Sequence, residues 1–225
     1  MMIQVTNIKK VFSYSGLHTV ALGGISMQVE QGEFVAIMGP SGCGKTTLLN
    51  ILGLLDNPTE GSYLLNGVEV AHLKERQRTD LRKGNIGFVF QSFNLIEELT
   101  VAQNVELPLK YMKVPAAERR TRVSEALRKL NISHRAMHFP YQLSGGQQQR
   151  VAIARAVVCE PSLVLADEPT ANLDTRNGKE VMELLASLND DGTTIIMATH
   201  SQRGAAYAQR TINMLDGFLV EKTEL

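Results

Sequence analysis

Residues 39–46, with the sequence GPSGCGKT, have the types and spacing of a phosphate-binding loop, G-x-x-x-x-G-K-[ST]. The glycines let the backbone turn tightly, so that successive N–H groups point into one concavity. Lys45 would place a positive charge on the β- and γ-phosphates of a nucleotide, and the Thr46 hydroxyl would be a Mg²⁺ ligand. Cys43 occupies a variable position, and we interpret it as a small filler. The spacing therefore predicts binding of a nucleoside triphosphate.

The loop requires a strand before it and a helix after it. The apolar run at 34–38 predicts a buried strand, and residues 46–52 predict a helix whose first turn lies at the loop. The positive end of that helix's macrodipole would face the phosphates. The alternative is a glycine-rich turn that happens to hold a lysine, which average glycine usage would give in about 1% of chains this long. The flanking elements make this alternative rarer still.

Two later segments could complete a nucleotide site. Ser144 is a suitable N-cap, and Gly145 and Gly146 would expose the first backbone N–H groups of the following helix. Asp167 and Glu168 directly follow a nearly pure apolar strand. Because neighbours on a strand point to opposite sides, one carboxylate can face Mg²⁺ and the other a water. The alternative for Ser144 and its glycines is an ordinary helix start, and the alternative for Asp167 and Glu168 is a strand end that only enters a loop. The phosphate loop at 39–46 favours the catalytic interpretation.

Composition narrows the class of protein. The chain has 225 residues, 44% of them apolar, which is ordinary for a globular α/β domain with a sizeable core. Lys+Arg and Asp+Glu both number 23, so net charge gives no reason to expect a nucleic-acid partner. No apolar run approaches the ~18 residues of a membrane span, and the N-terminus lacks the pattern of a signal peptide. We therefore expect a cytosolic chain in which Cys43 and Cys159 form no disulfide.

The remaining pattern predicts a helical segment set between strands. Residues 2–38 are strand-like, whereas residues 92–160 are predicted to be helical. Pro115 is predicted to open one helix, and Asp174 to cap a later one. The inward residues expected of the first of these helices are Ala116, Val123, Leu127 and Leu130. This order predicts a parallel-sheet nucleotide core with a helical lobe inserted between the phosphate loop and the acidic strand.

Together these elements resemble the nucleotide-binding domain of ATP-binding-cassette (ABC) transporters over essentially the whole chain. The most specific match is LSGGQ at 143–147, continued by QQRVAIARA, which is the signature of that family. The phosphate loop corresponds to Walker A, and residues 163–168 correspond to Walker B. The match extends to the D-loop at 171–174, the Q-loop glutamine Gln91 and the switch histidine His200. Ala171 stands where Ser or Gly is common in the D-loop.

The resemblance also implies a fold and a branch. The expected fold is α/β, with a P-loop NTPase (RecA-like) core, a mostly parallel sheet, an N-terminal antiparallel β subdomain and an inserted α-helical subdomain. Residues 1–91 and 161–225 would form the core of a single domain, and residues 92–160 would form the helical subdomain with the signature. Residues 87–96 and 104–109 look like the macrolide-exporter and lipoprotein-releasing branch.

The resemblance further implies roles for individual residues. Glu168 would polarise the attacking water, His200 would contact the γ-phosphate, and Lys45 would hold the phosphates. The Mg²⁺ ligands would be Thr46, Gln91 and Asp167. The adenine-stacking aromatic corresponds to Phe12, with Tyr14 two residues on as the alternative. The residues implied for binding ATP are Phe12, Tyr14, Gly39, Pro40, Ser41, Gly42, Cys43, Gly44, Lys45, Thr46, Thr47, Gln91, Ser144, Gly145, Gly146, Gln147 and Asp167.

The resemblance finally implies partners. Two copies would close over ATP, with Ser144 and Gly146 of one copy facing the phosphate loop of the other. The dimer would power a separate integral membrane permease with a large extracytoplasmic domain, for export, extraction or mechanotransmission. It would lie at the cytoplasmic face of a bacterial inner membrane. The alternative is a cytosolic ABC ATPase that regulates an envelope or cell-division partner without transport.

Overall fold

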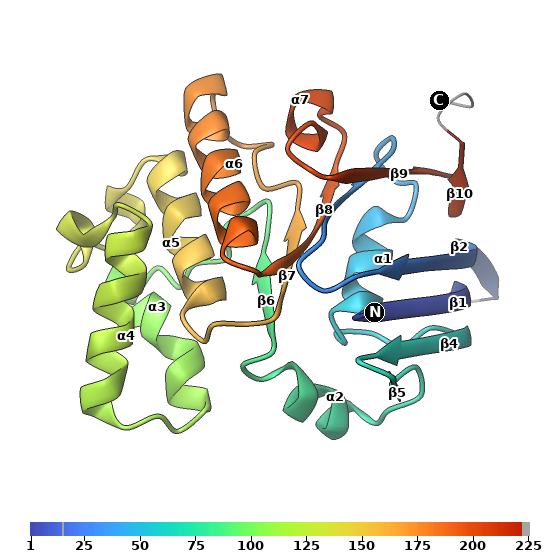
Figure 1. Cartoon of the computed structure of the whole chain (residues 1–225), viewed down its shortest axis with the longest axis horizontal. Coiled ribbons are helices and arrows are strands. Elements are labelled where there is room, and N and C mark those ends of the chain that lie inside the picture. Colours follow the sequence, from blue (N-terminus) through green and yellow to red (C-terminus); the bar gives the residue numbers. More distant parts are fainter. Residues whose placement is uncertain (15, 222–225) are drawn as a thin grey trace. The chain divides into compact units, whose positions relative to one another are not determined.

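The computed structural model describes residues 1–14 and 16–221, which form two compact units (Figure 1). The first unit comprises Met1–Arg82 and Thr194–Leu225, and the second comprises Lys83–Thr193. The elements of the first unit are β1 (Ile3–Tyr14), β2 (Leu17–Val29), β3 (Phe34–Met38), α1 (Lys45–Leu52), β4 (Glu60–Leu65), β5 (Val68–Glu69), α2 (Glu75–Arg82), β8 (Thr194–Thr199), α7 (Gln202–Ala205), β9 (Arg210–Leu215) and β10 (Phe218–Val220). Those of the second are β6 (Ile86–Val89), α3 (Val101–Tyr111), α4 (Ala116–Lys129), η1 (Ser133–Arg135), η2 (Pro140–Gln142), α5 (Gly145–Val157), β7 (Leu163–Asp167) and α6 (Thr175–Asp190).

The first unit contains an antiparallel sheet with the order β2-β1-β4-β5. Its long central strand β1 buries Ile3, Val5 and Ile8 and exposes residues nearer its end. The register with β2 shifts between Val5 and Ile8, which turns the strand so that both remain on the buried side. The predicted N-terminal antiparallel part is therefore confirmed.

Strand β3 is the centre of the second set of strands in this unit. It pairs in parallel with β8 and with β9, and β9 pairs antiparallel with β10. Strands buried on both faces have continuous apolar sequences, and β3 and β8 are buried along nearly their whole length. Strand β3 has the bounds expected from the sequence. The parallel pairing confirms the expected type of core.

The second unit contains a parallel strand pair, β6 and β7, and helix α5 packs against β6. Helices α3, α4 and α5 pack against one another, and α5 also contacts β6 and α6 (Figure 1). A Cβ built on Gly87 of β6 would lie 2.5 Å from the carbonyl oxygen of Ala156, so the missing side chain permits close approach of strand and helix. The helices expected within residues 92–160 thus belong to a unit that also contains β6, β7 and α6.

Two features differ from the sequence expectations. Helix α2 has no buried residue, so the apolar periodicity that reveals other helices gave no sign of it. Ala116 is exposed, because the buried side of α4 begins only at Val123 and continues through Ala126 and Leu127.

Among the described residues, no helix is long and apolar enough to cross a membrane.

Candidate functional site

The phosphate loop joins β3 to α1, and its glycines are required by the backbone. Gly42 and Gly44 have φ angles of 83° and 102°, in the left-handed region that favours glycine. A Cβ on Gly44 would lie 2.5 Å from the carbonyl oxygen of Ala21, and one on Gly39 would lie 2.1 Å from that of Met214. The glycines therefore let the loop turn tightly and pass close to neighbouring backbone, as a phosphate-binding loop requires.

Lys45 lies in the first turn of α1 and is 6% exposed. Its ammonium donates hydrogen bonds to the carbonyl oxygens of Gly39 and Pro40, at 2.8 and 2.9 Å. The charge is thereby held at the loop itself, where a phosphate would lie. Cys43 is buried, in agreement with its interpretation as a filler. Thr46 is exposed and Thr47 is half-buried, so the Thr46 hydroxyl can offer a metal the hard oxygen donor that Mg²⁺ prefers.

The position of His200 follows from the register of the parallel strands. Met38 at the end of β3 pairs with Thr199 at the end of β8. Gly39 and His200 are the next residues, so both leave the sheet at the same edge. His200 is exposed there. The first unit thus brings the switch histidine to the edge where the phosphate loop begins.

The two candidate aromatic residues both lie near the end of β1. Phe12 pairs with Thr19 of β2, and Tyr14 pairs with Leu17. Phe12 is 47% exposed and Tyr14 82% exposed, so either ring has an open face for a base. The ammonium of Lys10 lies over the Phe12 ring.

The acidic pair does not follow the simple strand geometry expected of it. Strand β7 ends at Asp167, and Glu168 has φ 46°, in the left-handed region. Alternation along a strand therefore cannot set the direction of the Glu168 side chain, and the prediction that the two carboxylates point to opposite sides for this reason is wrong. Glu168 instead opens a turn, in which its carbonyl accepts the N–H of Ala171 at 3.1 Å.

The signature begins helix α5 as predicted. Ser144 is the N-cap: its hydroxyl accepts the N–H of Gln147 at 3.4 Å, and its own N–H donates to the Gln147 side chain at 3.1 Å. This is a capping box, which satisfies two N–H groups of the helix start. Ser144 is exposed, so the remaining amides of the first turn lie beside an accessible surface.

The two signature glycines have different structural roles. A Cβ on Gly145 would meet nothing closer than 3.5 Å, whereas one on Gly146 would lie 2.4 Å from Oδ1 of Asn177. Asn177 cannot move away easily, because its backbone N–H and side-chain amide both donate to Asp174, at 2.9 and 2.6 Å. Both hydrogen bonds lower the pKa of the Asp174 carboxyl, and the one from the backbone N–H has the larger effect. Asp174 is also the N-cap of α6, as predicted.

We expect Gly146→Ala to lower the free energy of unfolding by about 1–3 kcal/mol, the usual cost of overpacking. Gly145→Ala should change it by less than about 0.5 kcal/mol, because a methyl group fits there. Urea unfolding followed by circular dichroism measures both. Equal stabilities of the two variants would contradict the close packing of Gly146 on Asn177.

Two side chains that the sequence analysis gave no role hold the Q-loop. Asn172 donates from Nδ2 to the carbonyl oxygen of Gln91 at 3.0 Å. Arg155 donates to the carbonyl oxygens of Asn94 and Phe93 at 2.5 and 2.9 Å. Phe93 and Asn94 have φ angles of 57° and 51°, an uncommon conformation for consecutive residues with side chains. Arg155 stabilises this conformation, and its burial lowers the pKa of its guanidinium.

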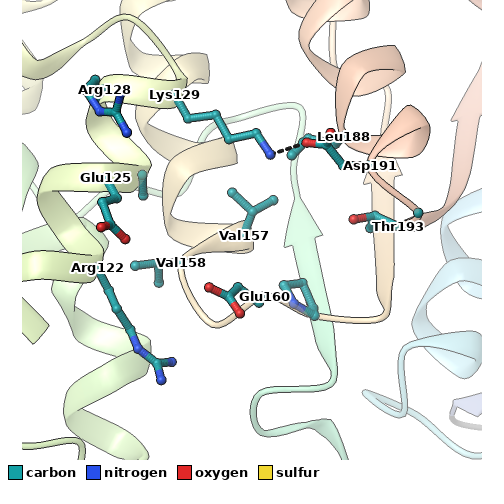
Figure 2. A pocket seen from close by; sticks show the side chains of 13 residues that line it. Arg122, Glu125, Arg128, Lys129, Val157, Val158, Glu160, Leu188, Asp191 and Thr193 are labelled. Atoms are coloured by element: carbon teal, nitrogen blue, oxygen red, sulfur yellow. Dashed lines mark hydrogen bonds and ion pairs between the residues drawn. The ribbon is translucent and has the colours of Figure 1, made fainter. Parts of the chain in front are cut away.

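The second unit also contains a cavity of about 650 Å³ between α4, the end of α5 and the end of α6 (Figure 2). Charged side chains of both signs line it, and Lys129 and Asp191 form an ion pair at its edge. None of the motif residues lines this cavity. In the described part of the chain, no group of three or more His, Cys, Asp or Glu side chains could hold a metal ion by itself.

Comparison with known proteins gives a consistent result. The family model for ABC transporters matches residues 22–171. An uncharacterized ABC transporter ATP-binding protein of Methanocaldococcus jannaschii is 47% identical over 220 residues, which are 98% of each chain. The macrolide export ATP-binding/permease protein MacB of Brucella melitensis is 48% identical over 222 residues, which are 99% of this chain and 34% of that protein.

A solved structure agrees with the fold. The ATP-binding cassette MJ0796, in a dimeric post-hydrolysis state bound to ADP and Pi, superposes with a TM-score of 0.91 and 43% identity, over 98% of this chain and 97% of that chain. The expected P-loop NTPase fold is thereby confirmed. With its phosphate loop and signature helix start, the chain belongs to the ABC transporter family as an ATP-binding protein that hydrolyses ATP.

Proposed function

We propose that the chain powers a separate membrane permease by hydrolysing MgATP at sites shared between two copies. The phosphate loop is the observation that carries nucleotide binding: a tight glycine turn with the Lys45 ammonium held on its carbonyl oxygens. The Thr46 hydroxyl, the Asp167 carboxylate and the Gln91 amide are oxygen donors of the kind that Mg²⁺ prefers. Bound with ATP, Mg²⁺ would neutralise charge on the phosphate oxygens.

The chain's own residues would supply positioning and proton transfer. Lys45 and the loop amides hold the β- and γ-phosphates, and the first turn of α1 adds its partial positive charge. Glu168 orients the attacking water and accepts its proton, while His200 contacts the γ-phosphate. Two observations support this assignment: His200 leaves β8 beside the start of the phosphate loop, and Glu168 follows the acidic end of β7.

The second copy would complete each site. Ser144, Gly145 and Gly146 present a helix N-terminus, and such termini bind anions. In the proposed dimer this helix start closes over the γ-phosphate held by the other copy. Each copy gives the same two surfaces, so the contact obeys two-fold symmetry. The dimeric state of the related cassette MJ0796 with ADP and Pi supports this arrangement.

The proposal of a membrane partner is supported by the name of one relative. The Brucella protein is named as both an ATP-binding protein and a permease, and this chain matches 34% of it. We propose that here the permease is a different polypeptide with a large extracytoplasmic domain. The cassette would then lie at the cytoplasmic face of a bacterial inner membrane. Export, extraction and mechanotransmission share this arrangement, as does regulation of an envelope partner without transport.

Purification of the tagged full chain from detergent-solubilised native membranes tests this proposal. We expect one integral membrane protein with a large extracytoplasmic domain to co-purify in a 1:1 ratio to the cassette, and to change its ATPase rate when the two are reconstituted. The same purification from membranes that contain the untagged chain identifies proteins that bind the resin by themselves. A stoichiometric cytosolic partner, or a membrane protein that leaves the ATPase rate unchanged, would contradict the proposal.

A further inference from the structure

Lys10 on β1 has an unusual set of contacts for a lysine near the surface. Its side chain is only 13% exposed. Its ammonium pairs with the Asp56 carboxylate at 2.7 Å and donates to the carbonyl oxygen of Asn57 at 2.8 Å. The same ammonium lies over the Phe12 ring, 5.1 Å from its centroid. One fixed charge therefore touches both the ring and the segment after α1.

This segment directly follows α1, the helix that begins at the phosphate loop. The N–H groups of Leu55 and Asp56 both donate to the carbonyl oxygen of Asn50 in α1, at 2.8 and 3.2 Å. The residues that hold the Lys10 ammonium are thus hydrogen-bonded to the C-terminal part of α1, the helix whose first residue is Lys45. Through Lys10, the Phe12 ring has a defined position relative to the phosphate-binding helix.

We propose that Lys10 is a positioning residue for recognition of the nucleotide base. Its ammonium covers one face of the Phe12 ring, and the 47% exposure of Phe12 leaves ring surface for a purine to stack on. A cation over one face is attracted by the ring and withdraws electron density from it. The ring then stacks more favourably on an electron-rich purine. This inference rests on the proposed function, in which Phe12 is the base-stacking aromatic.

The neighbouring residue Lys9 provides a matched control. Its ammonium pairs with Glu60 at 2.8 Å, and its side chain is 40% exposed. Lys9 and Lys10 therefore have the same charge and lie on the same strand, and both pair with a carboxylate. They differ in that Lys10 also covers the Phe12 ring, donates to the carbonyl oxygen of Asn57 and is less exposed. An effect found for Lys10 but not for Lys9 therefore does not come from net charge alone, and the Phe12→Ala background tests whether it acts through the ring.

The test compares ligands with and without a base, by calorimetry on the full chain. Lys10→Met should weaken MgATP binding about threefold, because only part of the free energy of this cation–π contact changes when the base stacks on the ring. Binding of magnesium tripolyphosphate, which lacks the base, should change less than about twofold. Lys10→Arg should restore MgATP binding, because a guanidinium can also pair with Asp56 and cover the ring. Lys9→Met should change the binding of neither ligand. In a chain that already carries Phe12→Ala, Lys10→Met should have no further effect on MgATP binding.

The outcomes separate this inference from the proposed function. If Phe12→Ala weakens MgATP binding but Lys10→Met does not, the role of Lys10 is refuted and Phe12 keeps its role. If Lys10→Met weakens both ligands equally, Lys10 acts as a general charge and the inference is overturned. If Tyr14→Ala alone weakens MgATP binding, then the base contact is at Tyr14, and both the assignment of Phe12 and the inference are wrong. Thermal unfolding of each variant shows whether it is still folded. If Lys10→Met does not fold, Lys10→Arg still tests the inference, because it keeps the positive charge.

Discussion

Glu168→Gln is expected to lower steady-state ATP hydrolysis by about 10²–10³-fold, because an amide cannot accept the proton of the attacking water. ATP binding should change little, since Lys45 and the loop amides are untouched. A coupled assay of ADP release gives the rate, and calorimetry gives the affinity. Glutamine has nearly the same shape as glutamate, so the turn that Glu168 opens should survive.

Glu183→Gln is a suitable control for this change. Glu183 is an exposed residue of α6 and pairs with Lys179 at 3.6 Å, so its loss removes one carboxylate without touching a motif. We expect its hydrolysis rate to stay within about twofold of wild type, as for surface changes in general. If Glu168→Gln kept more than about a tenth of the wild-type rate, another group would have to be the general base.

Ser144→Arg should abolish measurable hydrolysis while sparing ATP binding. Ser144 is exposed at the start of α5, and a long cationic side chain there would fill the space proposed for the other copy's nucleotide. A positive charge is also unfavourable at a helix N-terminus. The phosphate loop of the same chain is unchanged, so each copy should still bind ATP.

Ser144→Ala and Ser144→Thr distinguish obstruction of the nucleotide's space from loss of the helix N-cap. Ser144→Ala removes the hydroxyl that accepts the Gln147 N–H, at a cost of about 1 kcal/mol in stability. Ser144→Thr keeps a capping hydroxyl. We expect both to retain more activity than Ser144→Arg. Normal turnover by Ser144→Arg would show that this helix start takes no part in hydrolysis.

Local chemistry explains which features could be predicted from the sequence. The bounds of β3 could be predicted because a strand buried on both faces is apolar throughout. The helix starts after Ser144 and Asp174 could be predicted because capping depends on residues only three apart. These signals lie within a few residues of the feature that they specify.

Features that depend on distant residues could not be predicted. The left-handed pair Phe93 and Asn94 is stabilised by Arg155, about sixty positions later, and nothing near the loop indicates this. The close approach of Gly146 to Asn177 depends on how α5 packs on α6. The direction of the Glu168 side chain could not be predicted for a related reason: side chains alternate only while a strand continues, and β7 ends one residue earlier.

The mass of Glu168→Gln protein in solution tests the shared site most directly. Each chain has a mass of 24.8 kDa. With hydrolysis blocked, ATP should hold two copies together, so light scattering after size exclusion should give twice that mass with ATP and the single mass without it. Adding Ser144→Arg to the same chain should abolish the dimer. Monomers that persist with ATP demonstrably bound would contradict the claim that a second copy completes the site.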